Sequence, residues 1–452
     1  MNFDKRPYGV AILLLFAISV FVSCTKYLDA RPDKSFIVPK SVNDLAAIMN
    51  ANLTAGYPAC GAVASDFYYL SNTSFNSLGS ANLAKNYLWD GSTQSDLDLD
   101  YAQGYQRIFY CNVVLDEIKK LDPAQPRYEE VRSQALFFRA YNYFELAQIY
   151  AAHIQATGMQ QYGIPIKKQS DINEQTIRAS VKQTYDQILA DLLEAIEHLP
   201  ETTTTPELPT KAAGYALLSR IYLVIGNYEQ SASWGEKALA VNAALMDYST
   251  MDTLSNLSFK RYNKEIVFHA TMQPVMALNG SKAIVDTNLY RSYTDGDMRR
   301  PLYYRKNADG LSFRFKGNYD GTANILFCGL ATDELYLNLA ESYARTGKLD
   351  LAAKNLNTLL TTRYRLGKYV PITGDSQQML SVILKERYKE LAYRGGLIWM
   401  DLRRLNNDPS TARTLKRVIA DASYELKPGD LRYTFLFPVS VIAASGIEQN
   451  PR

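Results

Sequence analysis

The sequence has 452 residues, of which 47% are hydrophobic and 21% charged, enough for a large core in one domain or two closely packed ones. The 49 basic and 46 acidic residues give a net charge of +3. A near-neutral chain lacks the basic stripe that phosphate binding needs, so nucleic acid is not expected as a partner. The three His and four Cys show no CxxC or HxxxH spacing, and we predict no metal site and no cofactor.

The amino terminus has the pattern of a secretion signal. A short positive region precedes an apolar run, Val10 to Val22, which is too short to span a bilayer comfortably. Phe21-Val22-Ser23-Cys24 resembles a bacterial lipobox, in which the peptide is cut before the Cys and the Cys is acylated. We therefore predict a signal peptide over 1–23, lipidation of Cys24 and a polar tether over 24–35. An ordinary secretory signal that ends near a Cys is the alternative.

The rest of the chain is mainly helical in pattern. Apolar residues recur at three- and four-residue spacing over 101–121, 129–151, 176–199, 210–225, 228–241, 331–346, 349–364 and 378–394. Strand-like segments are few and short, namely Ile164–Ile166, Glu265–Thr271 and Tyr433–Pro438. Long stretches without a period, about 52–98 and 244–330, are candidates for functional loops. We predict a single, mainly α domain over 36–452.

Three helices share one spacing of Tyr, Leu, a small residue and a second Tyr. The copies are Tyr143-x2-Leu146-Ala147-x2-Tyr150, Tyr215-x2-Leu218-Ser219-x2-Tyr222 and Tyr336-x2-Leu339-Ala340-x2-Tyr343. The small residue lets a second helix approach closely, and Gly226 and Gly347 suit the turn to that helix. The pattern resembles the tetratricopeptide repeat. The copies are unevenly spaced, so we predict a scaffold of helix pairs over about 129–241 and 331–364, interrupted by large insertions.

No sequence motif for catalysis is present. GxSxG, GxxxxGK[ST], GxGxxG and HExxH are all absent, and we predict no catalytic residue. The densest charged group is Glu386, Arg387 and Glu390 with Asp401, Arg403 and Arg404. It is either a carboxylate pair for hydrolysis or an ion network that ties the last helix to the scaffold, and we favour the network. Of Cys60, Cys111 and Cys328, at most one pair can form a disulfide.

Several blocks together resemble the SusD/RagB family. Each block alone is weak, but they occur in the family's order from the signal peptide to the last residues. They include Tyr27-Leu28-Asp29-x2-Pro32, Ser65-Asp66-Phe67-Tyr68, Tyr105-x2-Ile108-x3-Asn112-x2-Leu115, Ala135-x3-Arg139-Ala140-x2-Tyr143-Phe144-x-Leu146, Gly163-Ile164-Pro165-Ile166, Glu386-Arg387-x2-Glu390-Leu391-Ala392, Trp399-x-Asp401-Leu402-Arg403-Arg404 and Gln449-Asn450-Pro451. Arg394-Gly395 departs from the family's usual Glu-Gly, which puts one local salt bridge in doubt.

This resemblance implies a SusD-like fold and a non-enzymatic role in nutrient uptake. Such a protein is a lipoprotein on the outer face of the outer membrane in Bacteroidetes-type bacteria. It captures a glycan, or in some members a peptide, for a SusC-like TonB-dependent transporter. Two alternatives remain open. One is a protein-interaction scaffold of the tetratricopeptide type at the cell envelope, and the other is a surface glycan hydrolase.

Candidate ligand-binding residues come from both long stretches without a period. A sugar site needs aromatic platforms with polar groups nearby. Such groups cluster around Tyr69 in the first stretch and around Asn288 and Tyr304 in the second. From these clusters we predict as binding residues Asp66, Tyr68, Asn72, Phe75, Asn76, Trp89, Tyr290, Tyr293, Asp297, Arg299 and Arg300. For Asp297-x-Arg299-Arg300, a clamp within the loop is an equal alternative.

Overall fold

The computed structural model describes residues 39–452 except 52, 93–97 and 374–375. The predicted signal peptide, the lipidation site Cys24 and the tether lie outside the described residues. Residues 41–452 form one compact unit, and the fold below is that of this unit. Within the described residues, no helix is both long enough and apolar enough to cross a membrane.

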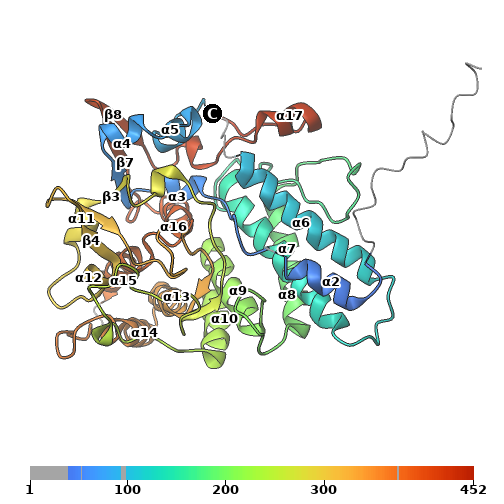
Figure 1. The fold of residues 1–452 in the computed structure, drawn as a ribbon, viewed down its shortest axis with the longest axis horizontal. Coiled ribbons are helices and arrows are strands. Elements are labelled where there is room, and N and C mark those ends of the chain that lie inside the picture. The colour runs from blue at the N-terminus through green and yellow to red at the C-terminus, as the bar shows by residue number, and fades with distance from the viewer. Residues whose placement is uncertain (1–38, 52, 93–97, 374–375) are drawn as a thin grey trace, which may run out of the picture. The chain divides into compact units, whose positions relative to one another are not determined.

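The unit is mainly helical, as the sequence predicts (Figure 1). Long helices carry the scaffold: α6 (Asp98–Ile118), α7 (Tyr128–Tyr150), α8 (Val181–His198), α9 (Lys211–Ile225), α10 (Tyr228–Val241), α13 (Thr332–Arg345), α14 (Leu349–Thr361) and α15 (Ser376–Leu391). Shorter helices are α2 (Val42–Met49), α3 (Cys60–Ala64), α4 (Asn72–Asn76), α5 (Ala81–Tyr87), α11 (Thr287–Arg291), α12 (Arg299–Tyr303), α16 (Leu397–Leu405) and α17 (Val439–Ser445). Single 3-10 turns cover Tyr248–Thr250, Met276–Leu278 and Leu431–Tyr433.

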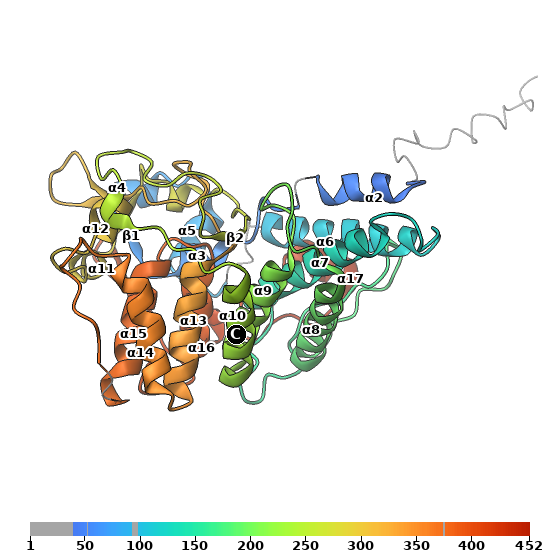
Figure 2. The ribbon, with the colours of Figure 1, turned by 90° about the horizontal axis from the view of Figure 1, so that it is seen from below.

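The long helices pack as sequential pairs. Helix α7 packs on α8, α9 on α10 and α13 on α14, and α13 also contacts α10 and α15 (Figure 2). The turn after α9 needs a left-handed residue, which Gly226 supplies with φ of 86°, and Gly347 has φ of 76° after α13. The insertion 244–330 therefore leaves the helix stack continuous, because α13 packs directly against α10.

Small residues mark the closest helix contacts, as the repeat pattern predicts. Ser219 of α9 is fully buried, and its carbonyl accepts a 2.9 Å hydrogen bond from the Ser231 hydroxyl of α10. A Cβ on Gly235 would lie 3.2 Å from both Leu339 of α13 and the Ser219 hydroxyl. The two repeats thus meet at a point where only small side chains fit.

Short antiparallel ladders hold the insertions together. Strand β1 (Tyr68–Leu70) pairs with β3 (Ala283–Val285), and β2 (Ile266–Phe268) with β6 (Leu330–Ala331). The hairpins are β4 (Tyr304–Lys306) with β5 (Phe313–Phe315), and β7 (Leu415–Ile419) with β8 (Ala422–Leu426). The β7–β8 hairpin near the C-terminus lies beside α4 and α5 (Figure 1), and the Ala420 amide donates to the Asn72 side chain at 3.0 Å.

Some sequence-based expectations fail in detail. The strand predicted at Tyr433–Pro438 is absent, and a 3-10 turn ends at Tyr433 instead. The segment Ile164–Ile166 contributes only an isolated bridge from Pro165 to Arg178. Strands of three residues carry too little alternation to be recognised before their partners are known. Cys60, Cys111 and Cys328 are buried free thiols, so no internal disulfide joins them.

Candidate functional site

The main pocket has a volume of about 1130 Å³ and gathers residues from distant parts of the chain. We use this name for the hollow between the region 66–69, the α11 region 286–292, the helices α15 and α16, and strand β7. A volume of this size is slightly above the usual range for small-ligand sites, roughly 300–1,000 Å³. The pocket therefore has room for a ligand of more than one sugar ring.

The β1–β3 ladder joins the two predicted clusters at this pocket. Tyr68 is paired with Val285 and Tyr69 with Ile284, so the first insertion lies against the second. Because strand side chains alternate, Tyr68 points into the core and is 2% exposed, while Tyr69 faces outward and is 37% exposed. The predicted residue Tyr68 is therefore buried, and its neighbour Tyr69 presents the accessible ring.

A polar triad stands at the wall of the pocket. The Asp66 carboxylate accepts a hydrogen bond from Arg413 at 3.0 Å and one from the Tyr388 hydroxyl at 3.2 Å. The Arg413 guanidinium also lies over the Tyr388 ring, 4.7 Å from its centroid. Burial raises the pKa of Tyr388 well above its ordinary value, and the nearby Asp66 adds to this shift. Tyr388 therefore stays a neutral hydroxyl at physiological pH.

Other groups at the pocket are free to meet a ligand. Tyr69, Asn288 and Lys385 are exposed, line the pocket and form no side-chain hydrogen bond within the described residues. They offer an aromatic face, an amide and an ammonium group. An aromatic face with a few convergent polar groups is the combination that sugar recognition requires.

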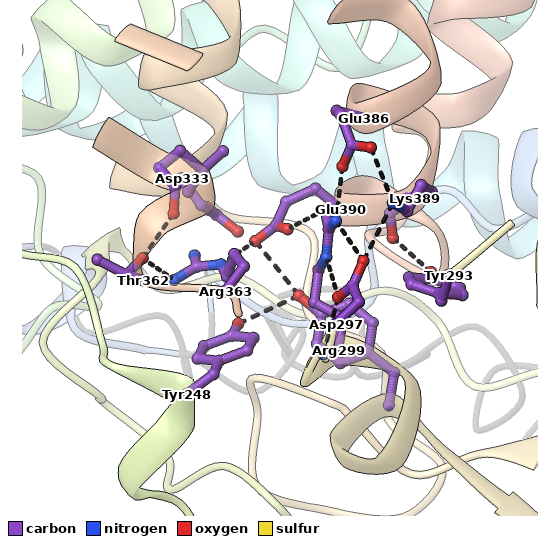
Figure 3. A network of polar contacts seen from close by, with 12 residues as sticks. Tyr248, Tyr293, Asp297, Arg299, Asp333, Thr362, Arg363, Glu386, Lys389 and Glu390 are labelled. Atoms are coloured by element: carbon purple, nitrogen blue, oxygen red, sulfur yellow. Dashed lines mark hydrogen bonds and ion pairs between the residues drawn. The ribbon is translucent and has the colours of Figure 1, made fainter. Parts of the chain in front are cut away.

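Two residues of the pocket lining, Glu386 and Lys389, belong to a buried ion network (Figure 3). In this "α15 network" Glu386, Lys389 and Glu390 project from α15 toward Arg299 and Asp297. Arg299 contacts Asp297 at 2.7 Å, Glu386 at 2.6 Å and Glu390 at 3.0 Å. Lys389 contacts Asp297 at 3.0 Å and Glu386 at 2.8 Å. Three charged side chains of α15, those of Glu386, Lys389 and Glu390, thus hold the insertion 244–330 against this helix.

The network continues to residues that do not line the pocket. Arg363 contacts Glu390 at 2.7 Å and Glu265 at 3.0 Å, and Arg394 contacts Asp333 at 2.7 Å. The departure from the family pattern at Arg394 therefore yields an ion pair with Asp333. The structure supports the sequence-based preference for an ion network at Glu386 and Glu390 and the loop clamp at Asp297 and Arg299. Only Glu386 and Lys389 of this network also line the pocket.

Several predicted binding residues have internal partners instead. Tyr293, Asp297 and Arg299 are buried, and the Tyr293 hydroxyl donates to the Lys389 carbonyl at 2.8 Å. Trp89 is 4% exposed, and its indole N–H donates to the Ala64 carbonyl at 2.8 Å. These four predictions need correction, because a side chain that is buried and already bonded presents no surface to a ligand.

Arg417 explains why the first cluster is so aromatic. Its guanidinium lies 3.7 Å from the ring centroid of Tyr87, 4.5 Å from that of Trp89 and 5.5 Å from that of Tyr68. It also donates to the carbonyls of Val63 and Ser65. The rings therefore enclose a buried cation and hold β7 against the first insertion.

The remaining predicted residues lie outside the pocket lining. Phe75 packs against Tyr87, and the exposed Asn72 accepts from Ala420 in the turn between β7 and β8. Asn76 is exposed, as is Arg300, whose guanidinium lies 5.8 Å from the Tyr290 ring centroid. The ring of Tyr290 stacks on that of Phe313 at 3.6 Å. Of the predicted set, the pocket brings together only Asp66 and Tyr68.

Sequence reasoning missed Tyr388, Lys385 and Arg413 as pocket residues. The helical period of α15 places Lys385 and Tyr388 three residues apart on one face, but nothing local shows that this face borders a pocket. The acids of the pocket have fixed partners: Asp401 pairs with Arg387 at 2.8 Å, and Asp286 accepts from the Leu289 amide at 2.9 Å. Burial raises the pKa of Asp286 above its ordinary value.

This arrangement suits binding better than acid–base chemistry, because its carboxylates are committed to cations or to backbone amides. Within the described residues there is also no group of three or more His, Cys, Asp or Glu side chains that could hold a metal ion.

Comparison with known families gives two matches, which together span most of the chain. Residues 26–223 match a family described as starch-binding and associating with the outer membrane. Residues 243–437 match the SusD family. A curated relative, the SusD-like protein P2 of Formosa agariphila, is 26% identical over 132 residues. That match spans 29% of this chain and 25% of the relative, so the chain matches about a quarter of the relative's length.

Solved structures share the fold at low identity. A SusD superfamily protein of Bacteroides vulgatus has a TM-score of 0.74 at 18% identity, covering 91% of this chain and 99% of that one. A SusD-like carbohydrate-binding protein of the same species has a TM-score of 0.69 at 20% identity, covering 89% and 96%. Surface glycan-binding protein A of Bacteroides fluxus has a TM-score of 0.70 at 16% identity, covering 91% and 100%. These likenesses show the fold.

Proposed function

Because this chain belongs to the SusD/RagB family, we propose that it is a nutrient-binding protein that captures an oligosaccharide in the main pocket. Two proteins of similar structure are named for this ligand class. One is a SusD-like carbohydrate-binding protein, and the other is a surface glycan-binding protein. The proposal assigns no catalytic step to the chain.

One observation carries this proposal. The main pocket presents the exposed Tyr69 ring together with the free Asn288 and Lys385 side chains, beside the Asp66–Arg413 pair. A flat ring accepts the apolar face of a sugar, while amide, ammonium and carboxylate groups meet its hydroxyls. Peptide is the second ligand class, and the same groups could meet its backbone.

A binding screen of the purified protein tests the proposal. Plant and host glycans and a peptide mixture are screened first, and calorimetry follows any hit. We expect Tyr69→Ala to weaken glycan binding about tenfold, because the variant loses the ring that stacks on a sugar. Tyr262→Ala is the matched control, since Tyr262 has a similar exposure of 41% and lies outside the pocket lining. Equal losses in both variants would contradict the assignment of the pocket.

Delivery of the ligand is the second part of the proposal. We propose that the protein hands its ligand to a SusC-like TonB-dependent transporter and is anchored in the outer membrane, facing outward, by acyl chains on Cys24. Two experiments test this. Affinity purification from outer membranes returns a barrel transporter, and metabolic labelling with a palmitate analogue marks the wild type but not Cys24→Ala. Labelling of both proteins would disprove acylation at Cys24.

Two alternatives predict other outcomes. A tetratricopeptide-type scaffold would return soluble proteins in place of a transporter and would bind no glycan or peptide in the screen. A surface hydrolase would turn over glycans in an assay of reducing ends, and Asp66→Asn or Asp286→Asn would abolish that turnover. The committed partners of these carboxylates favour binding over hydrolysis.

A further inference from the structure

The charged residues that line the main pocket differ in exposure according to their sign. Those of the described lining that are exposed are all cationic, namely Lys385, Arg413 and Lys416. The acids of the lining are half-buried or buried, namely Asp66, Asp286, Glu386 and Asp401. The remaining cations are buried, namely Arg387, Lys389 and Arg417. The charge that the pocket presents to solvent is therefore mainly positive.

The half-buried acids have partners within the protein. Asp66 pairs with Arg413 at 3.0 Å, and Glu386 pairs with Lys389 at 2.8 Å. Asp286 caps the first turn of α11, where it accepts a hydrogen bond from a backbone N–H at 2.9 Å. These internal contacts balance the negative charge of Asp66 and Glu386 before any ligand binds.

Lys385 has no such partner. It is exposed on α15 and forms no ion pair or side-chain hydrogen bond within the described residues. The other exposed cations are engaged, Lys416 by Glu425 at 2.7 Å and Arg413 by Asp66. The Lys416 and Arg413 side chains are still 67% and 43% exposed, so solvent screens both pairs. Lys385 thus adds an unmatched positive charge to the pocket.

Lys385 and Arg413 lie on either side of one ring in the pocket wall. The Arg413 guanidinium lies 4.7 Å from the ring centroid of Tyr388. Lys385 precedes Tyr388 by three residues on α15, so the two side chains are neighbours on the helix surface, with Cβ atoms roughly 5–6 Å apart. The exposed ring of Tyr69 lines the same pocket. The pocket therefore combines an accessible aromatic face with accessible cations.

We propose that the main pocket selects an acidic oligosaccharide and that Lys385 recognises its negative charge. This inference rests on the proposed function and names the class of glycan. A uronate carboxylate pairs with the ammonium group that the protein leaves unpaired, whereas a neutral sugar offers it only hydroxyls. A Lys ammonium acts as a point charge, so a sulfate ester meets the same requirement, and the experiment separates these two sources.

Calorimetry with matched pairs of oligosaccharides tests this selection. One pair is oligogalacturonate and its neutral methyl ester, and the other is a sulfated galactan oligosaccharide and its desulfated form. We expect at least one acidic form to bind about tenfold tighter than its neutral counterpart, because only the acidic form pairs with Lys385. Raising NaCl from about 50 mM to about 500 mM should narrow that difference, since salt screens an exposed pair. The pair that responds identifies carboxylate or sulfate.

Substitutions test the role of Lys385. Lys385→Gln removes the charge and should lower affinity for the acidic form about tenfold, while affinity for the neutral form stays unchanged. Lys385→Arg keeps the charge, and its affinity should stay within about threefold of wild type. Lys354→Gln is the matched control and should have no effect, since Lys354 is also exposed on a helix and lies outside the pocket lining.

The outcomes separate this inference from the proposed function. Neutral forms that bind as tightly as their acidic counterparts would overturn the inference and leave glycan binding intact. The same holds if a neutral glycan from the screen binds while neither acidic form does. A Lys385→Gln variant that loses no affinity, or loses it equally for both forms, would overturn the role of Lys385. Absence of binding to every glycan would contradict the proposed function as well.

Discussion

Helix α15 contributes to two regions, the α15 network and the main pocket, which contain the same kinds of side chain but differ in their exposure. On one side, Glu386, Lys389 and Glu390 meet the buried ions of the α15 network. On the other, Lys385 and Tyr388 border the main pocket, where Lys385 is exposed. Both regions are rich in tyrosine, arginine and carboxylates. The difference is accessibility. Each charged side chain of the network contacts at least one of opposite charge, while Lys385 at the pocket is exposed and has no ion pair within the described residues.

This comparison shows why composition alone does not separate residues of the pocket from residues of the clamp. A loop that contains Tyr, Asp and Arg has the chemistry of a sugar site and equally the chemistry of a buried clamp. The residues of the clamp, Tyr293, Asp297 and Arg299, bond to α15, a helix that also lines the pocket. The predictions below test the division between clamp and pocket, from the largest expected effect to the smallest.

Removing the central cation of the network should cost the most. Arg299→Met leaves three carboxylates without their shared partner in a fully buried place, and we expect a loss of about 3–5 kcal/mol in the free energy of unfolding. Urea denaturation measures this loss. Arg300→Met is the matched control, because the neighbouring Arg300 is exposed and its loss should change stability by less than about 0.5 kcal/mol. Equal effects would disprove the clamp.

The α15 network should also make the free energy of unfolding depend on pH. Its five carboxyl groups, those of Glu265, Asp297, Asp333, Glu386 and Glu390, share four cations, those of Arg299, Arg363, Lys389 and Arg394. One carboxyl is therefore expected to hold a proton, and burial raises the pKa of Asp333 from 3.8 to about 7.

A pKa raised in the folded state stabilises the protein below the ordinary pKa of Asp333, and this stability is lost as the pH rises through about 7. In Asp333→Asn we expect the free energy of unfolding to fall less between about pH 4 and pH 8 than in the wild type, by on the order of 1–3 kcal/mol. Urea unfolding at several pH values measures it. Asp295→Asn, at an aspartate whose side chain is 91% exposed, should keep the wild-type slope.

Substitutions at the pocket should lower ligand affinity and change the free energy of unfolding very little. Arg413→Ala breaks the pair with Asp66, whose two side chains are 43% and 25% exposed, so the free energy of unfolding should fall by less than about 1 kcal/mol. Affinity for the glycan found in the screen should fall about tenfold, because a charged donor is lost at the pocket wall. Calorimetry and urea unfolding of one preparation measure both. A large loss of stability with unchanged affinity would place Arg413 in the scaffold.

The smallest effect should come from Asn76→Ala. Asn76 is exposed and lies outside the pocket lining, although its sequence context predicts a binding residue. We expect its affinity for the same glycan to stay within about twofold of wild type. A loss as large as that of Tyr69→Ala would place the ligand on the surface of α4 instead of in the main pocket.

The amino-acid sequence by itself determined the helical scaffold. The apolar period located α6 to α10 and α13 to α15, and the repeated Tyr-Leu-small-Tyr spacing indicated where helices approach most closely. Both signals depend on residues within a few turns of each other, so they survive without knowledge of the rest of the chain. The ordered blocks likewise indicated the family that the comparisons then established.

Only the tertiary structure decided which polar and aromatic residues line the main pocket. The pairing of β1 with β3, two strands far apart in the sequence, leaves Tyr69 exposed and Tyr68 buried. Arg299 is buried by its ion pairs. Arg403 likewise donates to a carbonyl near the end of α7, far away in the sequence. The exposure of each side chain depends on contacts with residues distant in the chain, and a local sequence pattern does not predict those contacts.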